Sequence, residues 1–255
     1  MKRFTLAAVP APVSAEAGRG AAARQSLLAA AVEVFGERGL EAATTRDIAQ
    51  RAGQNIATIA YHFGNKEGLY LGVAEHIAGL LLKRTEARLA EAERLLARPK
   101  ASPSELLDAV TGLLAANVAT NREMLPVTAI IVREQQHPTR AFSILYDGAL
   151  ERLQRVGARL VAAYAGLAPD SQEGVVRFHA LLGESLAFRF ARETILRRAG
   201  WATIGEDEDA AIKTVVTEHA TWVLQGLRAR GRAAPSKKTA RRPAGRPATT
   251  RRRTP

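Results

Sequence analysis

Small and polar residues at fixed spacing mark the segment from Thr45 to Phe63 as the part of the chain with a recognisable chemistry. Two short helices that cross at a steep angle need a small residue where they meet, and Ala49 fills that position. Gly53 follows four residues later, where a sharp turn needs a positive φ. Asn55 is placed to cap the second helix, whose exposed side chains would enter the major groove of DNA. The turn alone leaves open a DNA-binding helix-turn-helix or an ordinary helical hairpin.

The patterns that carry catalysis are missing from the sequence. It contains no cysteine, which excludes disulfides, thiolate metal sites and cysteine nucleophiles. It has no glycine-rich phosphate loop, no Gly-x-Ser-x-Gly and no His-Glu-x-x-His. The acidic run 206–209 is interpreted as a helix N-terminus, and His137, which has no second histidine at ligand spacing, as a helix-end residue. The sequence therefore predicts a protein that is not an enzyme and uses no metal or cofactor.

Apolar residues recur at three- and four-residue steps along most of the chain, and no run alternates as a strand would. In the Thr45–Phe63 segment, Ile48 and Ile59 fall where they would pack the two short helices together. The sequence predicts an all-α fold of about nine helices. They are expected over 24–38, 45–52, 55–63, from Lys66 towards Pro99, from Ser102 past Leu114, and over 121–136, 139–165, 171–199 and 207–230.

Thr45–Phe63, followed by Gly64-Asn-Lys-Glu-Gly-Leu-Tyr70, closely resembles the DNA-binding domain of TetR-family transcription regulators. The shared features are a threonine-rich helix start, the alanine–glycine turn, a Tyr-His-Phe ending and Lys-Glu-x-Leu opening a fourth helix. The resemblance covers about residues 24–70. It implies an N-terminal three-helix, helix-turn-helix domain, followed by a helical domain that dimerises and senses a small molecule.

The resemblance also implies a set of DNA contacts. Thr45 would cap the second helix and touch a phosphate, while Asn55 and Thr58 would lie nearest the bases. Arg46 is either a further base or phosphate contact or a solvated surface arginine. The remaining contacts would be made to phosphates, by Tyr61 and His62 at the end of the recognition helix and by Lys66 at the start of the fourth helix.

The second half of the chain carries a further pattern, Ile131-Val-Arg-Glu-Gln-Gln-His-Pro-Thr-Arg-Ala-Phe142. It resembles the C-terminal domain of the CecR (YbiH) subgroup over roughly residues 105–225. Arg133 and Glu134 within it would either face a cavity or form a surface or interdomain ion pair. The helices 171–199 and 207–230 would, by resemblance, pair with a second subunit through their apolar faces, which carry Val175, Phe178, Leu182, Leu186, Val215, Val216, Trp222 and Val223. The effector and the residues that bind it are unknown.

Basic residues are concentrated at the end of the chain. The net charge is +12, and nine of the basic side chains, with no acidic one, follow Gly231. We expect a disordered arm over 1–20, a helix-turn-helix domain over 21–68, a helical effector-binding and dimerisation domain over 69–230, and a disordered basic tail over 231–255. No apolar run reaches the length of a membrane span, and a cytoplasmic protein is expected.

Together these features predict a ligand-responsive regulator, a repressor that binds a palindromic operator in double-stranded DNA as a homodimer. An unidentified small-molecule effector would release it. The alternative is a nucleoid-associated architectural protein, in which the basic tail dominates DNA binding.

Overall fold

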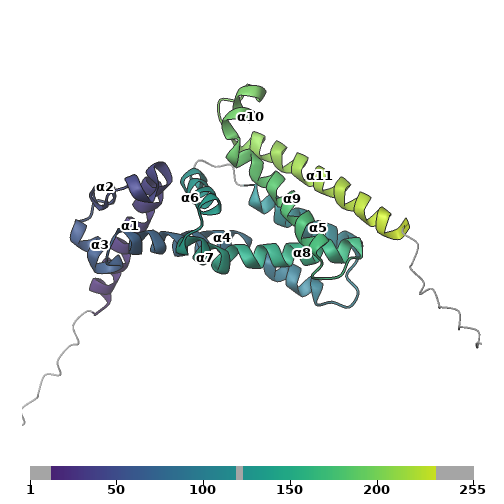
Figure 1. Cartoon of the computed structure of the whole chain (residues 1–255), viewed down its shortest axis with the longest axis horizontal. Helices are drawn as coiled ribbons and strands as arrows, with labels where there is room; N and C mark the ends of the chain where they lie inside the picture. The colour runs from purple at the N-terminus through teal and green to yellow at the C-terminus, as the bar shows by residue number, and fades with distance from the viewer. Residues whose placement is uncertain (1–12, 119–122, 234–255) are drawn as a thin grey trace, which may run out of the picture.

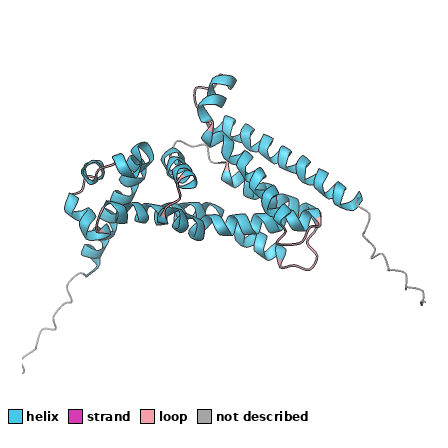
Figure 2. Ribbon diagram, viewed as in Figure 1, coloured by secondary structure: helices cyan, strands magenta, loops and turns pink. Residues whose placement is uncertain are grey.

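The computed structural model describes residues 13–118 and 123–233. Within these ranges all regular elements are helices, which confirms the predicted all-α class (Figure 2). Among these helices, none has both the length and the apolar character that a membrane span requires. The elements are α1 (Val13–Ala42), α2 (Thr45–Arg51), α3 (Ile56–Phe63), α4 (Lys66–Leu96), α5 (Pro103–Asn117), α6 (Met124–Gln136), α7 (Arg140–Leu145), the π-helical turn η1 (Tyr146–Leu150), α8 (Glu151–Ala165), α9 (Gln172–Phe190), α10 (Arg192–Ala199) and α11 (Glu206–Ala233).

Two of the nine expected helices are divided in the structure. The expected helix 139–165 consists of α7, η1 and α8, and the expected helix 171–199 consists of α9 and α10. Gly148 lies in the π-helical turn, where an added Cβ would stand 2.8 Å from the Cβ of Ala78 on α4. The missing side chain lets this turn approach α4 closely, a tertiary contact that helical periodicity does not reveal.

The structure also corrects the expected ends of the helical region. α1 begins at Val13, so residues 13–20, expected in a disordered arm, are helical. Pro10 and Pro12 precede this helix and do not interrupt it, because proline is unfavourable inside a helix but tolerated at its start. α11 continues to Ala233, past the expected start of the tail at residue 231. The rest of both segments, 1–12 and 234–255, lies outside the described residues.

The start of α5 is a capping box. The Ser102 hydroxyl accepts a hydrogen bond from the Glu105 N–H, and the Glu105 carboxylate accepts one from the Ser102 N–H. The pKa of Glu105 is lowered to about 2, mainly by these two hydrogen bonds and to a smaller extent by the ion pair with Arg98. The local sequence therefore suffices to define where this helix begins.

Buried side chains form two clusters, and α4 contributes to both. The head cluster combines α1–α4 with residues of α6 and α7, and includes Phe35, Ile48 and Ile59. The body cluster joins the C-terminal half of α4 to α5, α8, α9 and α11 around Phe178. Figure 1 shows α2 and α3 at one end of the elongated molecule and α11 along the other. The long helix α4 thus connects the head to the body.

Gly157 on α8 provides a test of the body packing. An added Cβ would lie 2.1 Å from Cζ of Phe178, whose side chain is fully buried. We expect Gly157→Ala to lower the free energy of unfolding by about 1–3 kcal/mol, because the buried ring must move. The matched control is Gly183→Ala on α9, where nothing lies within 4 Å and alanine favours the helix. Urea unfolding measures both, and stabilisation by both substitutions would contradict this packing.

Candidate nucleic-acid interface

The turn between α2 and α3 has the geometry predicted from the sequence. Gly53 adopts φ 64°, in the left-handed region. The N–H of Gln54 donates to the Ala49 carbonyl at 2.9 Å, which closes the turn. Ile48, Ala49 and Ile59 are buried, so the two short helices pack on each other and on α1. The expected packing of Ile48 and Ile59 is confirmed.

The caps of the two helices agree with the sequence prediction at α3 and differ at α2. Asn55 caps α3, its side-chain oxygen accepting from the Ala57 N–H at 2.9 Å. At α2 the cap is Thr44, whose hydroxyl accepts from the Asp47 N–H at 3.1 Å. Thr45, predicted as the cap, is instead the first residue of the helix. Adjacent threonines satisfy the same sequence pattern, and the backbone selects the one with extended dihedrals.

The residues of α3 that are exposed to solvent are Ile56, Ala57, Ala60 and Tyr61. Tyr61 is 85% exposed, which is unusual for an aromatic residue, and its ring lies edge-on to His62 with a centroid distance of 4.9 Å. Asn55 is also exposed, while Thr58 and His62 are half-buried. Thr58, Tyr61 and His62 therefore share one short helix at the end of the molecule, and Asn55 caps its start (Figure 1).

Lys66 has a structural role that the sequence did not reveal. It is half-buried at the start of α4, and its Nζ donates to the carbonyls of Glu41 and Ala43, both at 3.3 Å. These bonds hold the start of α4 against the connection between α1 and α2. An ammonium group has three donors, so one remains for another acceptor.

Most cations of the head are already paired within it. Residues 21–68 contain five basic and five acidic side chains. Arg38 donates to Asp47 at 2.7 Å, and Arg51 pairs with Glu33 and Glu37 at 3.3 and 3.0 Å. Arg46 is exposed and makes no ion pair with any described residue. Among the described residues of the head, the arginines that are exposed and outside any ion pair are Arg24 and Arg46.

Arg133 on α6 connects the head to the rest of the molecule. Its Nη1 donates to the carbonyl of Phe35 at 2.7 Å and its Nη2 to that of Gly36 at 3.0 Å. These carbonyls belong to the turn of α1 before Gly39, whose φ of 78° interrupts the helical backbone. An added Cβ on Gly36 would stand 2.5 Å from the Cβ of Pro126, so α6 lies directly on the α1 backbone.

The neighbouring Glu134 is almost fully buried and accepts three hydrogen bonds. Its Oε1 accepts from the Tyr70 hydroxyl at 2.9 Å, and its Oε2 accepts from the N–H and the hydroxyl of Thr139 at 3.0 and 2.9 Å. The pKa of Tyr70 is raised, mainly because its hydroxyl is buried. The hydrogen bond to Glu134 and the negative charge of that carboxylate raise it further. Arg133 and Glu134 therefore make hydrogen bonds between helices, in place of the expected cavity or ion pair.

No cluster of three potential metal ligands occurs in the described part of the chain. His137 is exposed and directly follows α6, where its N–H donates to the Arg133 carbonyl at 2.8 Å. It is thus a helix-end residue, as the sequence predicted. The acidic run 206–209 likewise forms the first turn of α11.

Known families match both halves of the chain. Residues 27–73 match the family described as bacterial regulatory proteins of the tetR family. Residues 103–227 match the C-terminal domain of the HTH-type transcriptional dual regulator CecR. The chain belongs to the TetR family, and is a helix-turn-helix, DNA-binding transcriptional regulator and not an enzyme.

Within this family the chain is of the CecR type. It is 38% identical to the dual regulator CecR of Shigella flexneri over 82% of this chain and 94% of the relative. It is 26% identical to the repressor KstR2 of Rhodococcus jostii over 86% and 97% of the two chains.

Solved structures of the family share the fold. A TetR-family regulator from Mesorhizobium loti superposes with a TM-score of 0.54 at 17% identity, over 83% of this chain and 98% of the other. A transcriptional regulator from Rhodococcus has a TM-score of 0.51 at 24% identity, over 80% and 96%. The arrangement of a helical head on a helical body is thus common to these proteins.

The two adjacent threonines give a direct test of the α2 cap. We expect Thr44→Ala to lower the free energy of unfolding by about 1 kcal/mol, because the Asp47 N–H loses its acceptor. Thr45→Ala should change it by less than about 0.5 kcal/mol, since no hydrogen bond involves that hydroxyl in the described structure. Chemical unfolding of the two variants decides the point. A larger loss for Thr45→Ala would restore the cap predicted from the sequence.

Proposed function

We propose that the protein is a ligand-responsive repressor that binds a palindromic operator as a homodimer and is released by a small-molecule effector. The observation that carries this proposal is the exposed outer surface of α3, on a helix held rigidly by the Gly53 turn and the Asn55 cap. Residues 21–68 would form the DNA-binding domain and 69–230 the effector-binding and dimerisation domain. The protein would act in the cytoplasm, on the DNA of the nucleoid.

The proposed DNA contacts divide by position on the head. Asn55 and Thr58, at the start and in the middle of α3, would lie nearest the base edges in the major groove. The other five would bind phosphates and set the register, with Arg46 also near enough to the groove to reach a base. They are Thr45 and Arg46 at the start of α2, Tyr61 and His62 at the end of α3, and Lys66 at the start of α4.

Apolar side chains exposed on α9 and α11 support dimerisation. Both helices already bury one apolar face in the body, through Phe178 on α9 and Val216 on α11. A second apolar face remains in solvent, including Trp222, which is 61% exposed. This exposed apolar face consists of Val175 and Val176 on α9 and Val215, Trp222 and Val223 on α11. Two-fold pairing of this face would bury it and place two heads for a palindromic site.

Regulation would act through the helices that join head and body. α4 carries Lys66 and Tyr70 in the head and Leu89 in the body, and α6 is bonded to α1 through Arg133. An effector that shifts α4 in the body, or that shifts α6 against α1, would therefore change the position of the head. CecR is named a dual regulator and KstR2 a repressor; repression is the simpler outcome when one bound dimer blocks a promoter.

One observation favours the alternative of an architectural protein. The head carries equal numbers of basic and acidic side chains, while nine basic and no acidic residues follow Gly231. Phosphate attraction by such a segment is independent of DNA sequence and weakens as salt rises. The two proposals therefore differ in whether specific binding survives removal of the tail.

The first test is footprinting on the DNA upstream of the protein's own gene. Protein ending at Ala233, which retains all of α11, is used in near-physiological salt with excess competitor DNA. We expect a protected palindrome and about tenfold weaker binding by Tyr61→Ala, because its phosphate contact is lost. Tyr146→Ala, an exposed tyrosine in η1, is the matched control and should bind as the parent does.

Full-length protein in the same assay separates the two proposals. Indiscriminate coating by the full chain, with no protected site for the shortened one, would favour the architectural protein. Equal loss of affinity in Tyr61→Ala and Tyr146→Ala would contradict the assigned role of α3.

A substitution that introduces a negative charge tests the exposed apolar face of α9 and α11. We expect Trp222→Glu to convert a dimer into monomers at micromolar concentration, because a buried unpaired carboxylate at the centre of an interface is strongly unfavourable. Leu80→Glu, at an exposed position of α4, is the control and should remain dimeric. Sedimentation equilibrium gives both masses. A dimer that persists in Trp222→Glu would exclude this face as the interface.

A further inference from the structure

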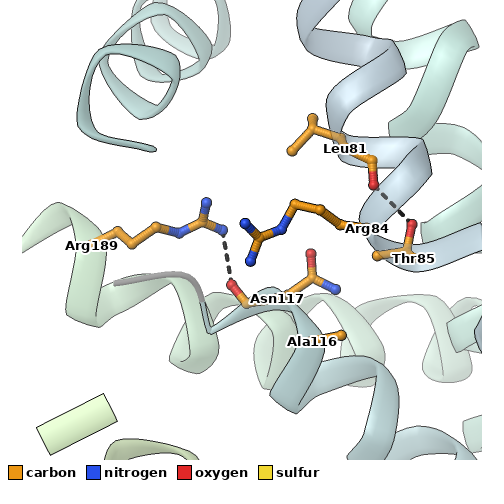
Figure 3. Close-up of a pocket in the computed structure, with 6 residues that line it drawn as sticks. All are labelled: Leu81, Arg84, Thr85, Ala116, Asn117 and Arg189. Atoms are coloured by element: carbon orange, nitrogen blue, oxygen red, sulfur yellow. Dashed lines mark hydrogen bonds between the residues drawn. The ribbon is translucent and has the colours of Figure 1, made fainter. Parts of the chain in front are cut away.

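Two arginines face each other where α4, α5 and α9 meet. Arg84 extends from α4 and Arg189 from α9, and their guanidinium groups point toward one another beside a small cavity (Figure 3). The sequence patterns assigned no role to either residue. The remaining wall of the cavity is formed by Leu81 and Thr85 of α4 and by Ala116 and Asn117 of α5.

Arg189 is half-buried and uses only part of its donor capacity. Its Nη2 donates to the backbone carbonyl of Asn117 at 3.0 Å, whereas its buried Nε has no hydrogen-bond partner in the described structure. A guanidinium carries five N–H donors in a planar fork. The pKa of Arg189 is lowered to about 10, mainly by burial and to a smaller extent by the positive charge of Arg84. Arg189 therefore stays protonated at neutral pH.

No carboxylate compensates this pair of charges. Within the described ranges, neither arginine belongs to a salt bridge. Elsewhere in the body, by contrast, Arg152 bonds to the carboxylates of both Glu86 and Glu93. Two facing positive charges and a buried, unsatisfied N–H both cost free energy. An anion held between them would remove both costs.

We propose that Arg84 and Arg189 bind the oxyanion group, a carboxylate or a phosphate, of a small anionic ligand, and that this ligand is the effector. The assignment as effector rests on the proposed function; the anion site itself does not. Planar guanidinium groups bind carboxylate and phosphate through parallel N–H donors, which explains the use of arginine at both positions.

The cavity limits how the ligand binds. Its volume is about 10 Å³, room for one water-sized group. One oxygen of the anion would occupy this space against Nε of Arg189, with the rest of the ligand extending past the exposed Arg84 towards solvent. Because Arg84 is on α4 and Arg189 on α9, the bound anion would draw these two helices together. α4 would transmit that movement to Lys66 in the head.

Isothermal titration calorimetry of the full-length protein tests the site, with inorganic phosphate and acetate as separate probes at constant ionic strength. We expect Arg84→Met and Arg189→Met each to weaken binding of the preferred probe about tenfold or more, because each removes charged donors. Arg94→Met on α4 and Arg198→Met on α10, both at exposed positions, are matched controls and should bind as the parent does. The stronger probe identifies the headgroup class.

Two results would overturn the anion site. One is that neither phosphate nor acetate binds. The other is unchanged binding in both methionine variants, which would place the anion elsewhere, for instance on the DNA-binding head. Thermal unfolding checks that the variants fold, and the exposed Arg84 provides a variant that leaves the buried packing untouched.

Operator affinity measured with and without the preferred probe tests the effector role separately. We expect the anion to weaken operator binding by the parent and not by Arg189→Met. If the parent binds the anion but operator affinity is unchanged, the site stands and its effector role is wrong. If the parent binds no operator under any condition, the proposed repressor function is wrong, and calorimetry still decides the anion site.

Discussion

The hydrogen bonds from Arg133 to the carbonyls of Phe35 and Gly36 are the contact on which the head depends. A three-helix unit of about 50 residues buries little surface and is only marginally stable alone. α6 supplies what is missing, since Met124, Val127 and Ile130 complete the head cluster. A cationic guanidinium on two carbonyls makes charge-assisted bonds, each worth about 1.5–3 kcal/mol. The same contact fixes α6 to the backbone of α1.

Glu134, the next residue of α6, joins this helix to α4. A buried carboxylate without donors would cost several kcal/mol, and here three donors from Tyr70 and Thr139 compensate it. Tyr70 also packs edge-on against Phe35, with ring centroids 5.0 Å apart. Consecutive residues of α6 thus hold α1 and α4 at once. A rotation of α6 would therefore alter its contacts with both helices.

The distribution of charge separates two parts of DNA binding. In the head, arginines such as Arg38 and Arg51 are used in internal ion pairs, which position α2 against α1. α3 contains no Lys, Arg, Asp or Glu, so its surface offers little general attraction to phosphate. The basic residues after Gly231 contribute most of the net charge of +12. Specificity and non-specific attraction would therefore come from different segments of the chain.

The sequence by itself determined those features that depend on residues a few positions apart. The all-helical class, the Gly53 turn, the Asn55 cap and the Ser102 capping box follow from local backbone preferences and hydrogen bonds. The spacing of these features along the chain also made the resemblance to TetR regulators visible. At α2 the sequence prediction placed the helix cap one residue too late, because Thr44 and Thr45 both satisfy the pattern of a cap.

Only the tertiary structure decided which distant groups meet. Arg133 binds a carbonyl 98 residues away and Glu134 a hydroxyl 64 residues away. Lys66 binds carbonyls at the end of α1, and Arg84 faces Arg189 from another helix. Helical periodicity shows which face of a helix is apolar but not which neighbour covers it. These contacts depend on how the helices pack, and the packing is set by the shape and burial of side chains from the whole chain.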